Sequence, residues 1–146
     1  MTGSEGLKIT RPQAKLKSFS EERGVNSMAK IDKFSFGSII IDGKKYSRDV
    51  LILADGMITK RKGGFLMFGS HNIRKEEIKE LAEDRPEAVI IGTGTNGKAS
   101  VAPEVEGWAK EKNLKLIVQP SYQAATRLNE LTEQGKRVAA LIHITC

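Results

Sequence analysis

The chain has 146 residues, a length typical of one domain, and 39% of them are hydrophobic, enough for one core. The apolar runs are far shorter than the roughly 20 residues that cross a bilayer, and no charged-then-apolar signal peptide opens the sequence, so we expect no membrane association. The single cysteine, Cys146, excludes a disulfide within the chain and favours a reducing, cytoplasmic location.

The net charge of +6 is spread along the sequence. Residues 1–33 carry seven Lys/Arg and four Asp/Glu, which gives +3, and residues 34–146 carry the other +3. Nucleic-acid binding usually gathers basic residues on one face. We therefore expect nucleic acid not to be a partner, and we interpret the basic run Lys60–Lys62 as the solvated tip of a hairpin.

The N-terminal part divides into a tail and a hairpin. Residues 1–33 contain few apolar side chains and are predicted to form a flexible tail, and a single domain is predicted over 34–146. Phe34–Ile41 is rich in strand formers. Asp42-Gly43 follows and is typical of a two-residue hairpin turn, because glycine takes the positive φ that this turn requires. Lys44–Leu53 then supplies the returning strand.

The pattern changes from strand to helix near residue 72. Two short strands are predicted over Met57–Lys60 and Phe65–Phe68. A helix is predicted from Arg74 to Asp84, with Ser70 or Asn72 as its N-cap, because apolar residues then recur at helical spacing.

The second half of the chain alternates strands with helices. Strands are predicted at Ala88–Ile91, Leu114–Val118 and Val138–Ile144, and helices begin at Pro103 and at Ser121, which we expect to be an N-cap. Continuous apolar strands indicate burial on both faces, and helical connections indicate parallel neighbours. The sequence thus predicts a three-layer α/β fold: a central mixed sheet with an N-terminal antiparallel hairpin, a C-terminal βαβαβ half, and helices packed on the sheet.

A glycine-rich segment, Gly92–Ser100, is the part of the sequence most suggestive of chemistry. Its spacing matches the phosphate-binding pattern G-x-x-x-x-G-K, in which backbone N–H groups and a lysine hold phosphate oxygens. The candidate ligand-binding residues are Gly92, Thr93, Gly94, Asn96, Gly97, Lys98 and Ser100.

Other features favour a plain strand-to-helix turn at this segment. Ala99 stands where a Ser or Thr would hold magnesium, and Pro103 indicates that the helix begins later than in a phosphate loop. We favour the turn and keep a small-anion site as the alternative, because the carboxyl edge of an open α/β sheet is where ligands bind.

The potential metal ligands are the two histidines, His71 and His143, and Cys146. Their spacing matches no zinc motif, so we expect no metal and no cofactor. Side-chain alternation along an extended segment puts His143 and Thr145 on one face and Cys146 on the other.

No motif predicts catalysis. Asp49 and Asp55 flank an apolar strand and are interpreted as strand-end residues, and Trp108 lies on the apolar face of a predicted helix, which indicates a core position. We find no Ser/His/Asp set, no C-x-x-C motif and no paired carboxylates in the sequence.

The C-terminal half carries a family resemblance. The run P-E-A-V-I-I-G-T-G over Pro86–Gly94, the later Gly135–Val138 and the ending His143-x-Thr145-Cys146 resemble the Mth-domain family. That family includes an adipogenesis-associated protein of animals and, more distantly, a mitochondrial complex I assembly factor. The resemblance covers residues 34–146 and implies a compact layered α/β fold without an established enzymatic activity.

Two functions are therefore expected from different classes. The first is a non-enzymatic accessory, assembly or regulatory protein that acts by binding another protein, itself a monomer or weak homodimer. The alternative is a small-molecule or nucleotide/phosphate-binding protein that uses Gly92–Ser100.

Overall fold

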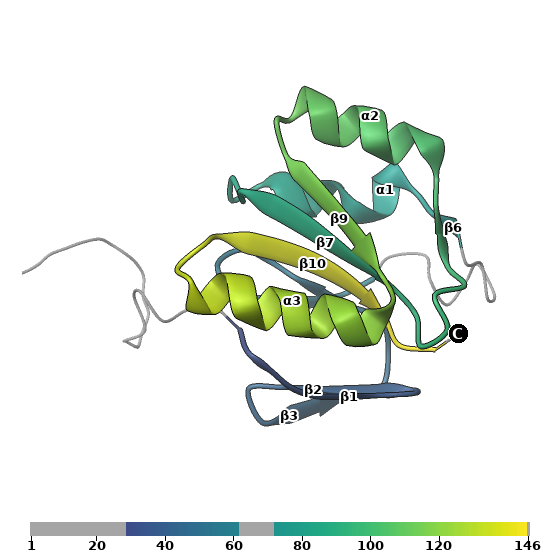
Figure 1. Cartoon of the computed structure of the whole chain (residues 1–146), viewed down its shortest axis with the longest axis vertical. Coiled ribbons are helices and arrows are strands. Elements are labelled where there is room, and N and C mark those ends of the chain that lie inside the picture. Colours follow the sequence, from purple (N-terminus) through teal and green to yellow (C-terminus); the bar gives the residue numbers. More distant parts are fainter. Residues whose placement is uncertain (1–28, 62–71, 146) are drawn as a thin grey trace, which may run out of the picture.

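A mixed five-stranded sheet forms the centre of the molecule. The computed structural model describes residues 29–61 and 72–145 (Figure 1). The strands of the sheet are β4 (Val50–Ile52), β5 (Ile58–Lys60), β7 (Ala88–Thr93), β9 (Lys115–Gln119) and β10 (Val138–His143). Their order is β5-β4-β10-β7-β9, in which β7 is parallel to both β9 and β10, and β4 is antiparallel to β10 and β5. The predicted mixed sheet is confirmed.

The C-terminal half has the predicted βαβαβ order. Helix α2 (Pro103–Glu111) connects β7 to β9, and α3 (Ser121–Glu133) connects β9 to β10. Pro103 is the first residue of α2, where its missing N–H costs no hydrogen bond. One detail differs from the prediction of strands buried on both faces. Strand β9 lies at the edge of the sheet instead of inside it, so Val118 is exposed.

The N-terminal strands form a small sheet of their own, in the order β1-β2-β3. It comprises β1 (Ile31–Ser35), β2 (Ser38–Ile41) and β3 (Lys44–Tyr46). The hairpin turn at Asp42-Gly43 is confirmed, with φ values of 50° and 82°. A turn at Phe36-Gly37 divides the strand-rich stretch Phe34–Ile41 between β1 and β2. The prediction of one returning strand over Lys44–Leu53 is wrong, because β3 pairs with β2 whereas β4 belongs to the central sheet. Ala29 and Ile31, which belong to the predicted tail, are buried in the core.

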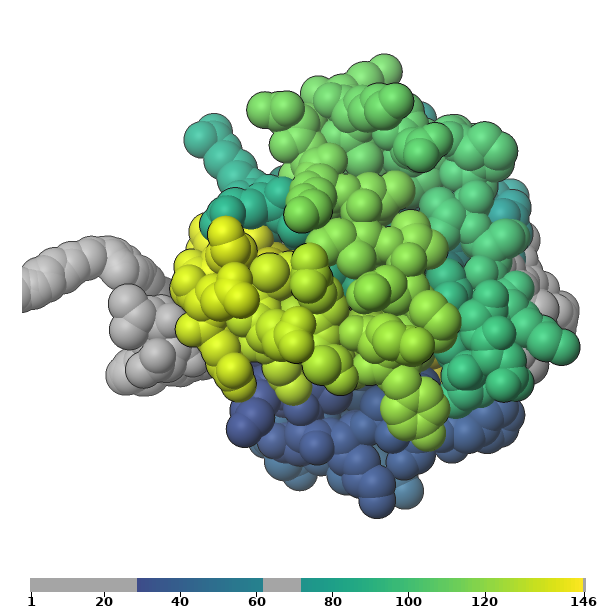
Figure 2. All heavy atoms as spheres, in the orientation of Figure 1, coloured from purple at the N-terminus to yellow at the C-terminus, as the bar shows by residue number. Residues whose placement is uncertain are grey.

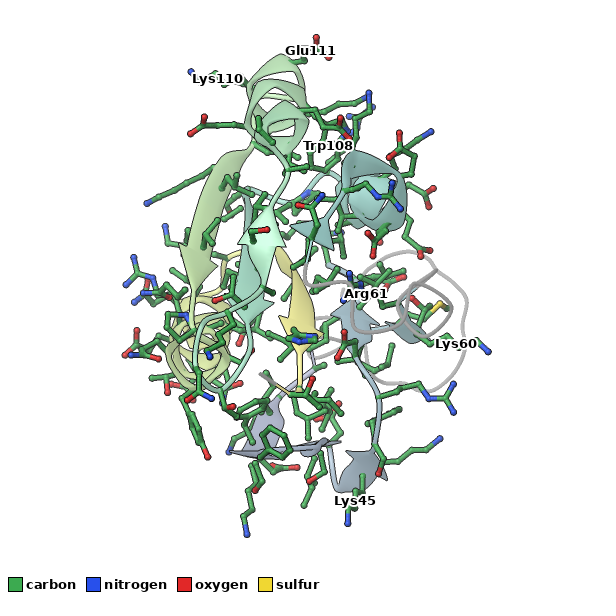
Figure 3. All side chains as sticks on the ribbon, turned by 90° about the vertical axis from the view of Figure 1, so that its right-hand side faces the viewer. Lys45, Lys60, Arg61, Trp108, Lys110 and Glu111 are labelled. Carbon is green, nitrogen blue, oxygen red and sulfur yellow. The ribbon has the colours of Figure 1, made fainter. Side chains whose placement is uncertain are left out.

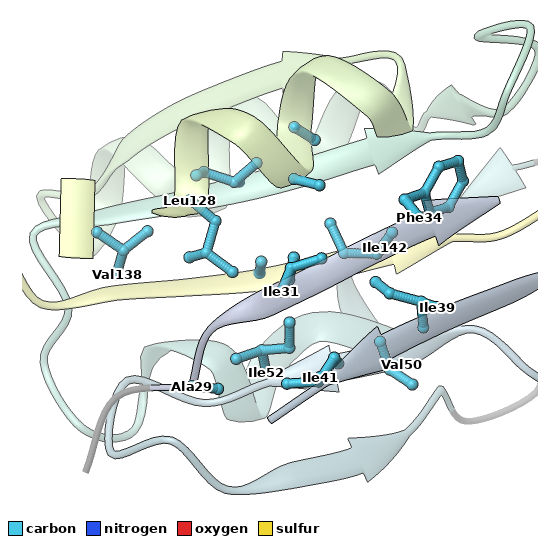
Figure 4. Packing of buried hydrophobic residues seen from close by; sticks show 14 of the residues in the cluster. Ala29, Ile31, Phe34, Ile39, Ile41, Val50, Ile52, Leu128, Val138 and Ile142 are labelled. Carbon is cyan, nitrogen blue, oxygen red and sulfur yellow. The ribbon is translucent and has the colours of Figure 1, made fainter. Parts of the chain in front are cut away.

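Two apolar layers cover the two faces of the central sheet. Helix α3 and the small sheet pack on one face, as Figures 1 and 4 show, and α1 (Lys75–Ile78), the 3-10 helix η2 (Lys79–Ala82) and α2 pack on the other. Strand alternation divides the side chains between the layers: Val50 and Ile52 join the α3 side, and Leu51 joins the α2 side. Trp108 is buried on the α2 side, which confirms its predicted core position.

The segment before β7 is less regular than the predicted helix over 74–84. The α-helix gives way to η2 after one turn, and its N-cap is Arg74, whose backbone N–H donates to Glu77 Oε2 at 3.1 Å. Asn72 is not the cap: it belongs to β6 (Asn72–Ile73), which pairs with β8 (Ser100–Val101). Ser70 and the predicted strand Phe65–Phe68 lie outside the described residues.

No helix in the described part of the chain is long and apolar enough to cross a membrane.

Candidate functional site

A row of polar residues lies at one end of the central sheet. In the strand register Ile142 pairs with Val50, and Val50 pairs with Lys60. The next residue on each strand, in the same direction along the sheet, is His143 on β10, Asp49 before β4 and Arg61 after β5. The register therefore brings together three residues that lie far apart in the sequence. We call these three, together with Glu77 and Thr145, the Asp49 cluster.

Arg61 is the buried cation of the cluster. Its Nε donates to Glu77 Oε1 at 2.5 Å, and its Nη1 donates to Asp49 Oδ2 at 2.8 Å. Only 2% of its side chain is exposed. Burial lowers the pKa of Arg61, but the hydrogen bonds and charges of Glu77 and Asp49 outweigh it and raise that pKa above its ordinary value. Arg61 is thus a fixed positive charge.

The prediction that Lys60–Lys62 forms a solvated tip is therefore wrong for Arg61. Lys60 is exposed, and Figure 3 shows it pointing away from the molecule while Arg61 turns inward. Lys62 lies outside the described residues. The basic triplet is divided because alternate side chains of an extended segment point to opposite sides.

Asp49 is the centre of the cluster and not only a strand-end residue. Its Oδ2 accepts hydrogen bonds from Arg61 Nη1 and from His143 Nδ1, both at 2.8 Å, and its Oδ1 accepts the backbone N–H of Ile144 at 2.9 Å. Burial raises the pKa of Asp49, but the contacts with His143, Ile144 and Arg61 together lower it below the ordinary 3.8. The carboxylate is therefore ionised and locked in place. Asp55, in contrast, matches its prediction and accepts the Met57 N–H within a turn.

His143 links the carboxylate to a hydroxyl group. Its Nε2 lies 3.2 Å from Thr145 Oγ1, so both residues face the same way, as the alternation in the sequence predicts. With Nδ1–H donated to Asp49, the hydrogen-bond pattern assigns Nε2 as the acceptor of the Thr145 hydroxyl. Thr145 is half-buried, whereas His143 is buried. The result is a carboxylate–imidazole–hydroxyl series.

The glycine-rich segment Gly92–Ser100 is hydrogen-bonded to the last member of this series, Thr145. Thr95 donates both its N–H, at 2.7 Å, and its Oγ1, at 3.3 Å, to the carbonyl oxygen of Thr145. Other loop amides also donate within the protein: Gly94 to Ser121 Oγ, Gly97 to Gly94 O, and Ala99 to Thr93 O. These N–H groups are thus oriented toward protein acceptors. The exposed side chains on the loop are those of Asn96, Lys98 and Ser100.

Ser121 ties the loop to β10. A Cβ on Gly92 would lie 2.8 Å from Ser121 Oγ, so only glycine allows this close approach. Ser121 Oγ accepts the Gly94 N–H at 2.8 Å and donates to the His143 carbonyl oxygen at 2.6 Å. The predicted N-cap role of Ser121 is wrong, because Pro120 holds that position and Ser121 is the first residue of α3.

The potential metal ligands are described only in part. His71 and Cys146 lie outside the described residues, and His143 belongs to the Asp49 cluster. Within residues 29–61 and 72–145 no group of three His, Cys, Asp or Glu side chains is arranged to hold a metal ion.

Two exposed aromatic residues lie near the same end of the molecule. Phe36 is 64% exposed in the β1–β2 turn, and Tyr122 is 52% exposed in the first turn of α3. Both adjoin buried Phe34: Tyr122 contacts its ring edge-to-face with 4.8 Å between centroids, and Phe36 follows it by two residues. The neighbouring Gly37 N–H donates to Ile144 O at 2.6 Å, which fixes the turn next to the Asp49 cluster. Figure 2 shows α3 and the small sheet meeting on one face.

Comparison with known proteins identifies relatives of this architecture. A family described as "Protein of unknown function (DUF498/DUF598)" matches residues 31–143. The solved structure of MT938 is 33% identical, covers 81% of this chain and 99% of its own, and has a TM-score of 0.69. PH1505 from Pyrococcus horikoshii OT3 is 31% identical over 80% of this chain and 99% of its own, with a TM-score of 0.71. A Mth938-like domain from Bordetella pertussis is 15% identical over 90% of this chain and 92% of its own, with a TM-score of 0.58, and is alike in fold. The Mth-domain resemblance in the sequence is confirmed.

Proposed function

The chain belongs to the DUF498/DUF598 family, whose function is unknown. We propose that it is a cytoplasmic accessory or regulatory protein that acts by binding another protein. The observation that carries this proposal is the pair of exposed aromatic side chains, Phe36 and Tyr122. Aromatic residues are enriched at the centres of protein interfaces, where a few of them provide most of the binding energy.

The rigidity of the two residues supports the same role. Tyr122 is fixed by its contact with Phe34, and the turn that carries Phe36 is fixed by the hydrogen bond from Gly37 to Ile144. A side chain that is already ordered loses little entropy on binding, so more of the energy of a contact appears as affinity.

Affinity capture from the native host with paired variants tests the proposal. We expect the unchanged chain to retain a stoichiometric partner, and the double variant Phe36→Ser/Tyr122→Ser to lose it. Met57→Ser is the matched control, since Met57 is 58% exposed on a different turn, and it is expected to retain the partner. Failure to recover any partner, or equal recovery with the double variant, would contradict the proposal. Sedimentation velocity of the free chain is expected to give a monomer or a weak homodimer.

A small-molecule or phosphate ligand at Gly92–Ser100 is the second candidate function. It is favoured by the contact of Thr95 with Thr145, which puts the loop beside the Asp49 cluster at the carboxyl edge of the sheet. Since several loop amides donate within the protein, the exposed side chains of Asn96, Lys98 and Ser100 are the groups that would hold an anion.

Thermal unfolding with ATP, NAD or inorganic phosphate separates the two candidates. A ligand at 100 times its dissociation constant stabilises the fold by about 2.7 kcal/mol. We expect Lys98→Ala to abolish any such shift, and Lys110→Ala, which removes an exposed lysine from α2, to leave it unchanged. An equal shift in both variants, or no shift with any of the three ligands, would contradict the second candidate.

A further inference from the structure

We propose that Asp49, His143 and Thr145 form an acyl-transfer site in which the Thr145 hydroxyl attacks small acyl esters and thioesters. The sequence favours a non-enzymatic domain, because it contains no recognisable catalytic motif. The strand register brings them together, and the proposal does not depend on the protein-binding role.

The geometry is that of an activated hydroxyl. Asp49 Oδ2 lies 2.8 Å from His143 Nδ1, and His143 Nε2 lies 3.2 Å from Thr145 Oγ1. A carboxylate that orients an imidazole, whose other nitrogen accepts a hydroxyl proton, is the arrangement by which enzymes turn a weak hydroxyl nucleophile into a strong one. Such an arrangement is recognised by its geometry and not by the order of its residues in the sequence. Both distances in this protein are within hydrogen-bond reach.

Asp49 and its partners hold the imidazole in one orientation. Both carboxylate oxygens are occupied, Oδ2 by Arg61 and His143 and Oδ1 by the Ile144 N–H. The carboxylate therefore has little freedom to turn, and the His143 ring that donates to it is fixed with Nε2 toward Thr145. Arg61 acts as a positioning residue, since it reaches Thr145 only through Asp49 and His143.

The Asp49 carboxylate lies against the imidazole that takes up the proton. Its Oδ2 is 2.8 Å from His143 Nδ1, so its negative charge stabilises the imidazolium that forms during the reaction. The largely buried surroundings strengthen this electrostatic effect, because water screens it less than at an exposed site.

Thr145 is positioned to react while the rest of the cluster is enclosed. Its backbone is fixed by Thr95, which donates two hydrogen bonds to its carbonyl oxygen. Thr145 is half-buried, so part of the residue is open to solvent, whereas His143 and Arg61 are buried.

The reaction moves the acyl group first to Thr145 and then to water. As Thr145 Oγ1 forms a bond to the acyl carbon, its proton passes to His143 Nε2. The bond from that carbon to the leaving sulfur or oxygen then breaks, and the leaving group takes the electron pair and the proton from His143. Water repeats the sequence on the acyl-threonine with His143 as base. The products are a carboxylic acid and a thiol or alcohol, and Thr145 is regenerated.

The test is acylation of the full chain by p-nitrophenyl acetate in a Cys146→Ser background, because the neighbouring thiol would itself react. We expect acetyl transfer to Thr145, detected by peptide mass spectrometry, together with release of nitrophenolate. Thr145→Val and His143→Gln should each lower the rate by about 100-fold, the least that a positioned general base contributes. Thr145→Ser keeps a hydroxyl at this position, so acetylation at residue 145 should still be detected in it.

Two controls keep the result interpretable. Thr126→Val removes a hydroxyl on the exposed face of α3 and should leave the rate unchanged. Among the described residues, the Thr145 hydroxyl forms a hydrogen bond with His143 alone. We therefore expect Thr145→Val to fold, and circular dichroism checks this. Acetylation confined to lysines, or an unchanged rate in folded Thr145→Val, would overturn the proposal.

Discussion

Replacement of Arg61 by methionine tests whether the Asp49 cluster stabilises the fold as an ion network. Methionine retains the long apolar stem of the side chain, so the change removes mainly the charge and its hydrogen bonds. Asp49 and Glu77 would then keep their negative charges without the cation between them. We expect the variant to be folded but strongly destabilised.

The magnitude follows from burial and from the number of contacts. Arg61 makes two hydrogen bonds to carboxylates, and each such bond contributes about 1.5–3 kcal/mol. Loss of one partner of a buried ion pair costs about 3–5 kcal/mol. The side chains of Asp49 and Glu77 remain 15% and 9% exposed, and Asp49 keeps two other donors, so we expect a loss of about 3 kcal/mol, at the lower end of that range.

Urea unfolding followed by the fluorescence of Trp108, the single tryptophan, measures this loss. The control is Lys60→Met, which changes the adjacent exposed cation and should alter the free energy of unfolding by less than about 0.5 kcal/mol. Adding Glu77→Gln to Arg61→Met should recover part of the loss, because one uncompensated charge disappears. If Arg61→Met costs less than about 1 kcal/mol, the network does not stabilise the fold as a buried pair would.

Three further outcomes are expected. The pKa of Asp49 is lower in the folded than in the unfolded chain, so the ionised carboxylate stabilises the fold. This stabilisation is complete above the ordinary pKa of 3.8 and is lost as the pH falls through the folded pKa. When the urea midpoint is measured at decreasing pH, Asp49→Asn should therefore lose less stability than the unchanged chain. Gly92→Ala should cost about 1–3 kcal/mol in the same urea assay, since its methyl group would meet Ser121 Oγ at 2.8 Å, and an unchanged midpoint would show that the neighbours yield freely. Ser121→Ala leaves the Gly94 N–H and the His143 carbonyl without their common partner and should cost about 1–3 kcal/mol, with accelerated amide exchange at Gly94 as the local signature.

The layered fold was predictable because its signals are local. The apolar runs of β7 and β10, the proline at the start of α2 and the Asp42-Gly43 turn each lie within a few residues, and the structure confirms all of them. The edge position of β9 was not predictable in this way. An edge strand and a central strand can carry the same apolar run, and strand order is decided by contacts between distant segments.

The Asp49 cluster shows the same limit at the level of the site. Arg61 lies between two lysines, and nothing within that triplet distinguishes a buried guanidinium from a solvated one. Its partner Asp49 is 12 residues away, and His143 is 94 residues from Asp49. Only the strand register shows that the three side chains are in contact. One part of the site could be predicted from the sequence. His143 and Thr145 are two residues apart, and side-chain alternation along a strand puts such residues on the same face. Ser121 was assigned to a helix cap because serine suits that position, and its actual partners belong to other elements.

The position of β10 in the middle of the sheet has a consequence for how the protein is made. Among the elements in the described part of the chain this strand comes last in sequence, yet it pairs with both β4 and β7. The β4–β5 hairpin and the β7–β9 pair lie on either side of it and are joined into one sheet only through residues 138–143. Until those residues have left the ribosome, neither β4 nor β7 can form its native pairing with β10.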